Sequence, residues 1–205
     1  MGIWKIEETE AFFLSVVPLE RDIVHPHKRL QHLAGRYLLR HLFADFPYNL
    51  IRIADTRKPF LINEAYHFSI SHCGNYAAAI VSKTRRVGID IELVQPKVGR
   101  VREKFLGEKE LTLVDESKPV FYGREHNADS LDLTMLTLCW SAKESVYKWY
   151  GYGHVDFKNH IRLTSHISQD GEGLQQLYRF SKEAPVDLIV KSTIFDGIVM
   201  SYVLT

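Results

Sequence analysis

The chain has 205 residues, and its hydrophobic content of 45% is ordinary for a folded protein with an apolar core. Lysine and arginine number 26 against 25 aspartates and glutamates, so the net charge of +1 gives no reason to expect a nucleic-acid partner. Two cysteines are too few for a disulfide scaffold, and no segment approaches the roughly 20 apolar residues that span a bilayer. The start of the chain lacks the basic and then apolar segments of a signal peptide. We therefore expect a cytoplasmic protein with no membrane or nucleic-acid partner.

The first half of the chain predicts one amphipathic helix and then a series of strands. Pro26 suits the first turn of a helix, and apolar residues recur with helical period over residues 27–44. Arg29, Arg36 and Arg40 fall on one stripe beside the apolar arc, which is either an anion-binding edge or a solvated basic face. The segments that then predict strands are 51–55, 67–72, 75–82 and 85–93.

The second half repeats this order of helices followed by strands. Helical patterns cover residues 98–115 and 131–150, with a polar, glycine-containing insert at 118–130 between them. The further candidate strands are 161–168, 174–180, 186–195 and 197–205. We predict the α+β fold class, with an N-terminal lobe of residues 1–97 and a C-terminal lobe of residues 98–205. Since no linker rich in proline, glycine or serine separates the lobes, we expect one compact unit with its active site between them.

Two carboxylates in the segment VGIDIELV are the first candidate functional residues. Asp90 and Glu92 stand two positions apart on a predicted strand, so both side chains leave the same face while Ile89 and Ile91 leave the other. Like charges at neighbouring positions raise each other's energy unless a cation or a proton compensates. In phosphate chemistry the usual cation is Mg²⁺ with oxygen ligands. Taken alone, however, such a pair is more often a solvated strand face than a metal site.

The helical segment CWSAKESVYKWYG offers a second group. Glu144 and Lys148 lie four residues apart on one stripe of the helix, and Lys143 flanks them. A helical carboxylate can complete a metal site begun on a strand, with a lysine one turn away aimed at the phosphate that the metal holds. The alternative is an ordinary helical ion pair, which is worth about 0.2–0.5 kcal/mol.

The segment SISHCGN offers a third group. Ser71 and His72 close a predicted strand and are followed by Gly74, whose missing Cβ permits a ligand to approach the backbone closely. A hydroxyl, an imidazole and turn amides together suit a phosphate. A single histidine near a strand end is, by itself, more often a structural residue than a ligand.

The order of these segments is more specific than any one of them. RKPF, FSISHCGN, VGIDIE, FLGEKE and WSAKESVYKWYG follow one another along the chain. This series closely resembles the ordered signature of the 4'-phosphopantetheinyl transferase superfamily, and the chain length resembles its larger, surfactin-synthetase-activating type. The resemblance implies two similar α+β lobes that form a pseudo-dimer. It also implies an enzyme that transfers the 4'-phosphopantetheine group of coenzyme A to a serine of an acyl or peptidyl carrier protein, releasing 3',5'-ADP, with Mg²⁺ as cofactor.

The resemblance assigns roles at the reacting pyrophosphate of coenzyme A. Asp90, Glu92 and Glu144 are implied as the ligands of Mg²⁺, which they would hold together with the pyrophosphate. Lys148 would contact the same pyrophosphate, and Lys143 would support it. Among these residues, Glu144 and Lys148 are the implied catalytic groups.

The resemblance also assigns the nucleotide end and the general base. Arg40 and His72 are implied at the 3'-phosphate of coenzyme A, and Lys58 with Pro59 would line the nucleotide. Glu110 matches the glutamate proposed as general base, while water activated by the metal is the alternative. Further nucleotide contacts are left open among Lys28, Arg29 and Arg36, and Trp140 is expected to serve in packing only.

Two other functions share these residues. A catalytically silent coenzyme A binding module would carry the same motifs, and a metal-dependent phosphohydrolase or nuclease would use the same carboxylates. Since one chain holds a full set of motifs, we expect a monomer that binds one coenzyme A. The carrier would dock near the lobe junction, where Arg100, Arg102 and Lys104 form either a docking surface or a solvated face.

Overall fold

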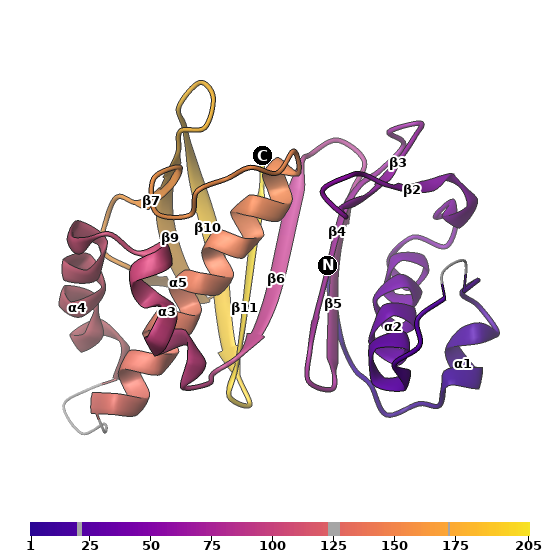
Figure 1. The fold of residues 1–205 in the computed structure, drawn as a ribbon, viewed down its shortest axis with the longest axis horizontal. Helices are drawn as coiled ribbons and strands as arrows, with labels where there is room; N and C mark the ends of the chain where they lie inside the picture. Colours follow the sequence, from indigo (N-terminus) through magenta and orange to yellow (C-terminus); the bar gives the residue numbers. More distant parts are fainter. Residues whose placement is uncertain (20–21, 123–127, 172) are drawn as a thin grey trace.

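Two antiparallel sheets stand side by side in the middle of the molecule, and helices cover the outer side of each sheet (Figure 1). The structure is a computed structural model that describes residues 1–19, 22–122, 128–171 and 173–205, without the side chains of residues 118–132. None of the described helices combines the length and the apolar character that a membrane crossing requires.

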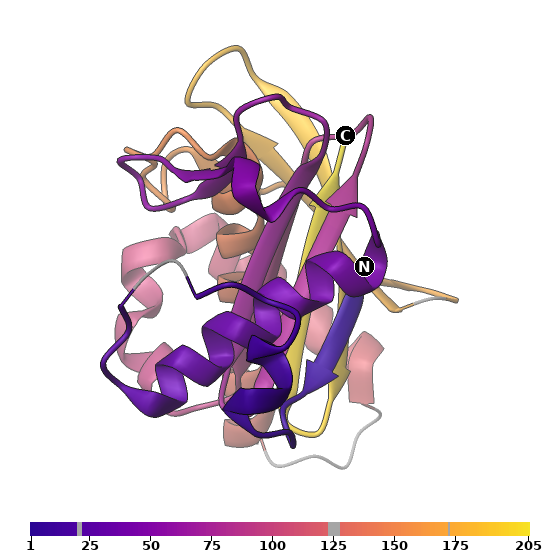
Figure 2. The same ribbon diagram turned by 90° about the vertical axis from the view of Figure 1, so that its right-hand side faces the viewer.

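The N-terminal sheet has three strands in the order β1 (Gly2–Lys5), β5 (Tyr76–Ser82) and β4 (His67–Cys73). Helices α1 (Glu10–Leu14) and α2 (Pro26–Leu42) lie on its outer face, as the turned view in Figure 2 shows. A short 3₁₀ helix (Tyr48–Leu50) leads into a separate hairpin of β2 (Ile51–Ile53) and β3 (Pro59–Leu61). The buried residues of this half include Phe13 of α1, Leu33 and Leu38 of α2, and Phe68 of β4, which form one apolar core.

The C-terminal sheet has six strands and is covered by three helices. Its order is β6 (Val87–Leu93), β11 (Ile198–Leu204), β10 (Val186–Phe195), β9 (Gly173–Phe180) and β7 (Ile161–Leu163), with β8 (Ser168–Asp170) also paired to β9. The helices are α3 (Lys97–Phe105), α4 (Glu108–Tyr122) and α5 (Ala128–Tyr150). Helix α5 lies along the face of the sheet next to β6, so its C-terminal end reaches the junction of the two sheets (Figure 1).

The two sheets meet through a small apolar core and a pair of serine side chains. Ile89 and Ile91 of β6 pack with Ala78 of β5 between the sheets. Strands β4 and β6 belong to different sheets, yet the backbone amide of Ile89 donates to Ser69 Oγ at 3.2 Å and that of Ile91 to Ser71 Oγ at 3.3 Å. Side-chain hydroxyls therefore join two strand edges that no backbone ladder connects.

Most of the elements expected from the sequence are present, and the α+β class is confirmed. The helix expected over 98–115 is instead two helices, α3 and α4, which are separated at Leu106–Gly107. The polar insert expected at 118–130 is helical at its start, and its residues 123–127 lie outside the described residues. Strand β6 pairs with β11 although it falls within the predicted N-terminal lobe. The lobe boundary and the pseudo-dimeric relation of the lobes stay predictions.

Gly88 of β6 allows α5 to lie directly on the strand. A Cβ atom at this position would stand 2.0 Å from the backbone oxygen of Ser145 and 2.6 Å from the backbone nitrogen of Trp149. Both atoms belong to the backbone of a helix, so neither can move aside as a flexible side chain could. The absence of a side chain at Gly88 is therefore a packing requirement.

We expect Gly88→Ala to lower the free energy of unfolding by at least about 2 kcal/mol, because α5 must be displaced to admit the methyl group. Urea unfolding followed by circular dichroism measures the change. Gly171→Ala is the matched control, since a Cβ there meets no atom within 4 Å and should cost little. Equal stabilities of the two variants would contradict the close approach of α5 to β6.

Candidate functional site

Three polar side chains from three elements meet at the junction of the sheets. Lys148 Nζ, near the C-terminal end of α5, lies 2.6 Å from Asp90 Oδ1 of β6 and 2.8 Å from Ser71 Oγ of β4. The Ser71 hydroxyl donates to the same Asp90 oxygen at 2.9 Å, and it accepts from the amide of Ile91. This triad of Ser71, Asp90 and Lys148 brings together residues that the sequence analysis placed in three separate motifs.

Glu92 and Glu144 are two further carboxyl groups whose charges interact with that of Asp90, and these three residues are called the acidic group. Burial, Asp90 and Glu92 together raise the pKa of Glu144 to about 7. Burial and Asp90 also raise the pKa of Glu92. Asp90 is 3% exposed, and its Oδ2 has no hydrogen-bond partner among the described residues. The predicted face shared by Asp90 and Glu92 is confirmed by Ile91, which packs on the opposite side of β6.

The end of β4 adds an imidazole and a turn to this site. Partial desolvation, followed by the charges of Lys28 and Lys148, lowers the pKa of His72, while Asp90 acts in the opposite direction. Gly74 has a φ of +49°, and its backbone oxygen accepts from Gln31 Nε2 at 2.7 Å, which fixes the turn against α2. The strand end therefore places an imidazole and a fixed turn next to Ser71 of the triad.

Arg40, which was assigned with His72 to the 3'-phosphate, makes its contact elsewhere. Its guanidinium is 5.8 Å from the ring centre of Tyr48, and no contact of Arg40 with His72 is present in the part of the chain that the structure describes. Lys28, from the first turns of α2, is instead the α2 cation whose charge lowers the pKa of His72. The assignment of Arg40 to the 3'-phosphate stays a prediction, and Lys28 becomes a second candidate for the same role.

A cavity of about 170 Å³ opens next to the triad, between the β2–β3 hairpin, β4 and the end of α5. Lys58 and Pro59 line it from the hairpin, and Lys148 lines it from α5. Lys58 Nζ also donates to the backbone oxygen of Lys148, which fastens the hairpin to the helix end. The sequence-predicted Lys58–Pro59 pair therefore borders the same space as the triad.

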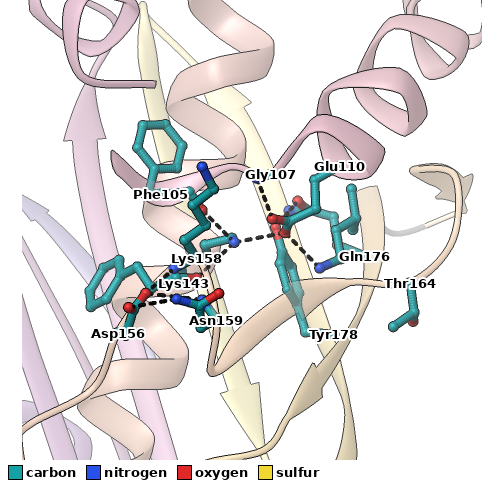
Figure 3. A network of polar contacts seen from close by, with 12 residues as sticks. Phe105, Gly107, Glu110, Lys143, Asp156, Lys158, Asn159, Thr164, Gln176 and Tyr178 are labelled. Carbon is teal, nitrogen blue, oxygen red and sulfur yellow. Dashed lines mark hydrogen bonds and ion pairs between the residues drawn. The ribbon is translucent and has the colours of Figure 1, made fainter. Parts of the chain in front are cut away.

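Lys143 and Glu110 lie elsewhere, in the interior of the C-terminal half (Figure 3). Lys143 is 0% exposed, and its Nζ lies 2.7 Å from Glu110 Oε1. The same ammonium donates to the backbone oxygens of Phe105 and Phe157 at 2.6 and 2.9 Å, so all three of its protons have acceptors. In this arrangement all donors of Lys143 are used within the protein, and its support of the pyrophosphate stays a prediction.

Glu110 is likewise occupied by protein partners. Besides Lys143, its carboxylate accepts from the amide of Gly107 at 2.9 Å (Figure 3). It also accepts from the amide of Leu163 at 2.8 Å. Glu110 thereby holds the start of α4, the strand β7 and helix α5 together. The prediction that it serves as general base is not tested by this arrangement and stays a prediction.

Trp140 connects this buried pair to the acidic group. Its ring packs against those of Phe105 and Phe157, with centres 5.2 and 5.4 Å away, and these two residues supply the carbonyls that hold Lys143. Its Nε1 donates to Glu92 Oε1 at 3.1 Å. The packing role expected for Trp140 from its large apolar surface is therefore joined by a hydrogen bond to Glu92, which nothing in the sequence indicates.

Comparison with models of protein families identifies the family of this chain. Residues 86–204, more than half of the chain, match the model of the 4'-phosphopantetheinyl transferase superfamily. The chain belongs to the 4'-phosphopantetheinyl transferase superfamily. This result confirms the resemblance drawn from the ordered motifs.

Several named relatives agree with this membership. The chain is 30% identical over 171 residues to a Haemophilus influenzae protein designated a candidate 4'-phosphopantetheinyl transferase, covering 80% of this chain and 68% of that one. It is 33% identical over 122 residues to enterobactin synthase component D of Salmonella austin, covering 59% and 47%. It is 32% identical over 159 residues to the mouse L-aminoadipate-semialdehyde dehydrogenase-phosphopantetheinyl transferase, covering 72% and 50%. The chain thus spans about half the length of several of the curated relatives it matches.

The acidic group suits the Mg²⁺ that the family resemblance implies. Among the described residues, no three His, Cys, Asp or Glu side chains are gathered as a ready metal site. The donor chemistry nevertheless fits a hard cation, because Asp90 Oδ2 lacks a partner there and the carboxyls of Glu92 and Glu144 have raised pKa values. Their roles as metal ligands stay a prediction.

We expect Glu144→Gln to flatten the pH dependence of stability. The folded-state pKa of about 7 lies above the ordinary value of 4.5, so the folded chain retains a proton that the unfolded chain loses between these values. The free energy of unfolding therefore falls as pH rises through this range. The variant should lose about 1–3 kcal/mol less than the wild type between about pH 5 and about pH 8.

Urea unfolding at the two pH values measures this difference. Glu108→Gln, which changes an exposed carboxylate in the first turn of α4, is the control and should keep the wild-type profile. Parallel profiles for the wild type and Glu144→Gln would show that Glu144 is not protonated in the folded chain at neutral pH.

Proposed function

We propose that the chain transfers the 4'-phosphopantetheine group of coenzyme A to a serine of an acyl or peptidyl carrier protein and releases 3',5'-ADP. The observation that carries the proposal is the triad of Ser71, Asp90 and Lys148 at the lobe junction, beside two more carboxylates and a cavity. Membership of the superfamily and the names of the relatives support the same reaction.

The reaction has to bring a neutral hydroxyl to a phosphorus atom that is surrounded by negative oxygens. The carrier serine oxygen forms a bond to the phosphorus that bears pantetheine, and the bond between that phosphorus and the bridging oxygen of the pyrophosphate breaks. The leaving group is 3',5'-ADP, which takes the electron pair. Catalysis of such a transfer depends mainly on positioning and on charge stabilisation.

Lys148 is suited to stabilise the charge that develops on the leaving phosphate. Its ammonium is fixed by Asp90 at 2.6 Å and Ser71 at 2.8 Å, and Lys148 also lines the adjoining cavity. Asp90, Glu92 and Glu144 would hold Mg²⁺, which supplies positive charge at the pyrophosphate when bound. The carboxylates and Lys148 come from β6 and α5, in the C-terminal sheet and its helix, and β4 of the N-terminal sheet contributes Ser71.

The carrier serine must also lose its proton. Glu110 is 6% exposed at its side chain and has Lys143, Gly107 and Leu163 as partners, so it would have to leave all three to accept that proton. Transfer of the proton to a water molecule requires no such rearrangement, and we therefore favour water over Glu110 as the acceptor.

A binding experiment can decide whether Arg40 or Lys28 contacts the 3'-phosphate of coenzyme A. If Arg40 contacts the 3'-phosphate, Arg40→Ala should weaken coenzyme A about ten- to hundredfold while leaving 3'-dephospho-coenzyme A nearly unchanged. Lys28→Ala should show this selectivity instead if the cation beside His72 is the one that binds. Calorimetric titration of both ligands measures the four affinities. Equal weakening of both ligands by each substitution would exclude either residue from the 3'-phosphate.

The proposed transfer is tested by a mass measurement on candidate carrier proteins after incubation with coenzyme A and Mg²⁺. The carrier should gain one phosphopantetheine group, and a carrier with its acceptor serine replaced by alanine should gain none. We expect Asp90→Asn and Glu144→Gln to abolish the gain without unfolding the chain. Coenzyme A binding without modification of any carrier would identify a silent binding module, and hydrolysis of a simple phosphodiester would identify a phosphohydrolase.

The finer parts of the proposal concern type, location and assembly. We infer the larger, surfactin-synthetase-activating type, a cytoplasmic location and a monomer that binds one coenzyme A per chain. The contribution of both β6 and α5 to the triad supports a site complete within one chain. Light scattering together with calorimetric stoichiometry tests this inference, and an obligate oligomer or two ligands per chain would overturn it.

A further inference from the structure

The β2–β3 hairpin belongs to neither of the two main sheets and forms a two-stranded sheet of its own (Figure 1). Its base is anchored in the N-terminal core by Ile51 and Leu61, which are both buried. Farther along the hairpin, the side chains of Ile53 and Phe60 are exposed, so this part buries less apolar surface than the base. The hairpin is therefore firmly fixed at its base, and its outer part depends on contacts made by its tip.

The tip of the hairpin reaches across to the C-terminal half and rests on the end of α5. Thr56 Oγ1 donates to the backbone oxygen of Gly151 at 3.1 Å, and Lys58 Nζ donates to that of Lys148. Backbone oxygens at the C-terminal end of a helix lack helical partners and carry partial negative charge, which favours donors such as these. Because both bonds come from side chains, they can be exchanged without unfolding the hairpin or the helix.

Two glycines of the loop after α5 form the surface on which the tip rests. A Cβ atom at Gly151 would stand 2.7 Å from Lys58 Nζ, and one at Gly153 would stand 2.7 Å from Thr56 Cγ2. The φ angles of these glycines are +80° and +71°, a conformation that residues without a Cβ adopt readily. The side chains of the tip thus lie directly against the backbone of the loop.

This contact lies where two cavities adjoin. Lys58, Pro59 and Gly151 line both the cavity of about 170 Å³ beside the triad and a second one of about 370 Å³. The smaller cavity is below the range of about 300–1,000 Å³ that is usual for sites of small molecules. Coenzyme A, with its nucleotide, pyrophosphate and pantetheine arm, is a large ligand of that class. Movement of the tip away from α5 would join the two spaces beside Lys148.

We propose that the β2–β3 hairpin is a lid, whose tip leaves the end of α5 to admit coenzyme A and returns to it once the ligand is bound. The inference rests on the proposed function, since it takes coenzyme A to be the ligand. The hairpin turns about its buried base at Ile51 and Leu61, and the hydrogen bonds of Thr56 and Lys58 to the end of α5 break as it opens. The Lys58 ammonium is then released from the Lys148 carbonyl while the ligand enters.

A disulfide between the tip and the loop tests whether this movement is needed. A Cβ atom at Gly153 would lie 3.7 Å from Thr56 Cβ, and disulfides join Cβ atoms about 3.5–4.5 Å apart. The double variant Thr56→Cys/Gly153→Cys should therefore form a crosslink on oxidation, which mass spectrometry detects. We expect the oxidised form to bind coenzyme A about tenfold or more slowly than the same protein after reduction, as measured by stopped-flow fluorescence.

The two single variants, taken through the same oxidation and reduction, control for the chain's own cysteines and should show no such difference. Equal association rates for the oxidised and reduced double variant would overturn the lid. Failure of the two cysteines to crosslink in a folded protein would also overturn it, because the closed contact would then be absent. A wild type that does not bind coenzyme A would overturn the proposed function and the lid with it, so a titration of the wild type separates the two failures.

A substitution that weakens the closed state tests the lid in the opposite direction. Thr56→Val keeps the shape of the side chain but removes the hydroxyl that donates to Gly151, and loss of one such bond shifts an equilibrium about two- to tenfold. Since the closed contact is lost from both the free and the bound protein, the association and dissociation rates of coenzyme A should both rise by this factor. The affinity should then change by less than about twofold.

Thr193→Val is the matched control for this measurement, because Thr193 is an exposed residue of β10, and it should leave both rates unchanged. A weaker affinity of Thr56→Val with an unchanged association rate would identify Thr56 as an ordinary contact of the ligand and would overturn the lid.

Discussion

Two serine hydroxyls determine how the halves of this molecule meet. Ser69 and Ser71 of β4 accept hydrogen bonds from the backbone of β6, so two strand edges are satisfied without forming a continuous sheet. Edge strands ordinarily need a partner or a cover for their exposed amides. Here the hydroxyls of Ser69 and Ser71 are the partners. They hold β4 and β6 apart and keep the two strands in register. Asp90 then comes to lie opposite Ser71 and within reach of Lys148.

The same contacts explain why the acidic group lies where it does. Ser71 has one proton to donate, and it gives that proton to Asp90 while accepting from Lys148 and from the β6 backbone. One lysine and one hydroxyl do not balance three carboxylates that are largely withdrawn from water. Burial and the negative charge of Asp90 therefore raise the pKa values of Glu92 and Glu144. Binding of a cation would therefore be favourable at this site, and a bound cation would in turn attract the negatively charged pyrophosphate.

The sequence predicts the elements of this fold better than their contacts. Helix α2 follows from Pro26 and a clear apolar period, and the shared face of Asp90 and Glu92 follows from strand alternation alone. The break between α3 and α4 does not follow, because it depends on Gly107 donating to a carboxylate three residues later. Neither does strand β1, whose four residues are too few for alternation to stand out.

Contacts between residues far apart in the sequence are harder still to predict. The alternation in FSIS indicates that Ser69 and Ser71 share a face, but it predicts a solvent-facing one, whereas the structure buries both against β6. Lys143 and Glu110 carry the charges typical of an active site, yet they form a buried internal pair. Pairing of distant residues is set by tertiary packing, which no local pattern in the sequence encodes.

The glycine beneath α5 has a chemical consequence as well as a steric one. Gly88, Asp90 and Glu92 lie on the same face of β6, and at Gly88 the backbone of the helix occupies the space that a side chain would need. A lysine side chain has a fixed maximum length, so the height of the helix above the strand decides whether its ammonium can touch a carboxylate below. Coulomb attraction weakens with separation, and added separation also admits water between the charges. The absence of a side chain at Gly88 thus lets α5 lie close enough to β6 for Lys148 to contact Asp90.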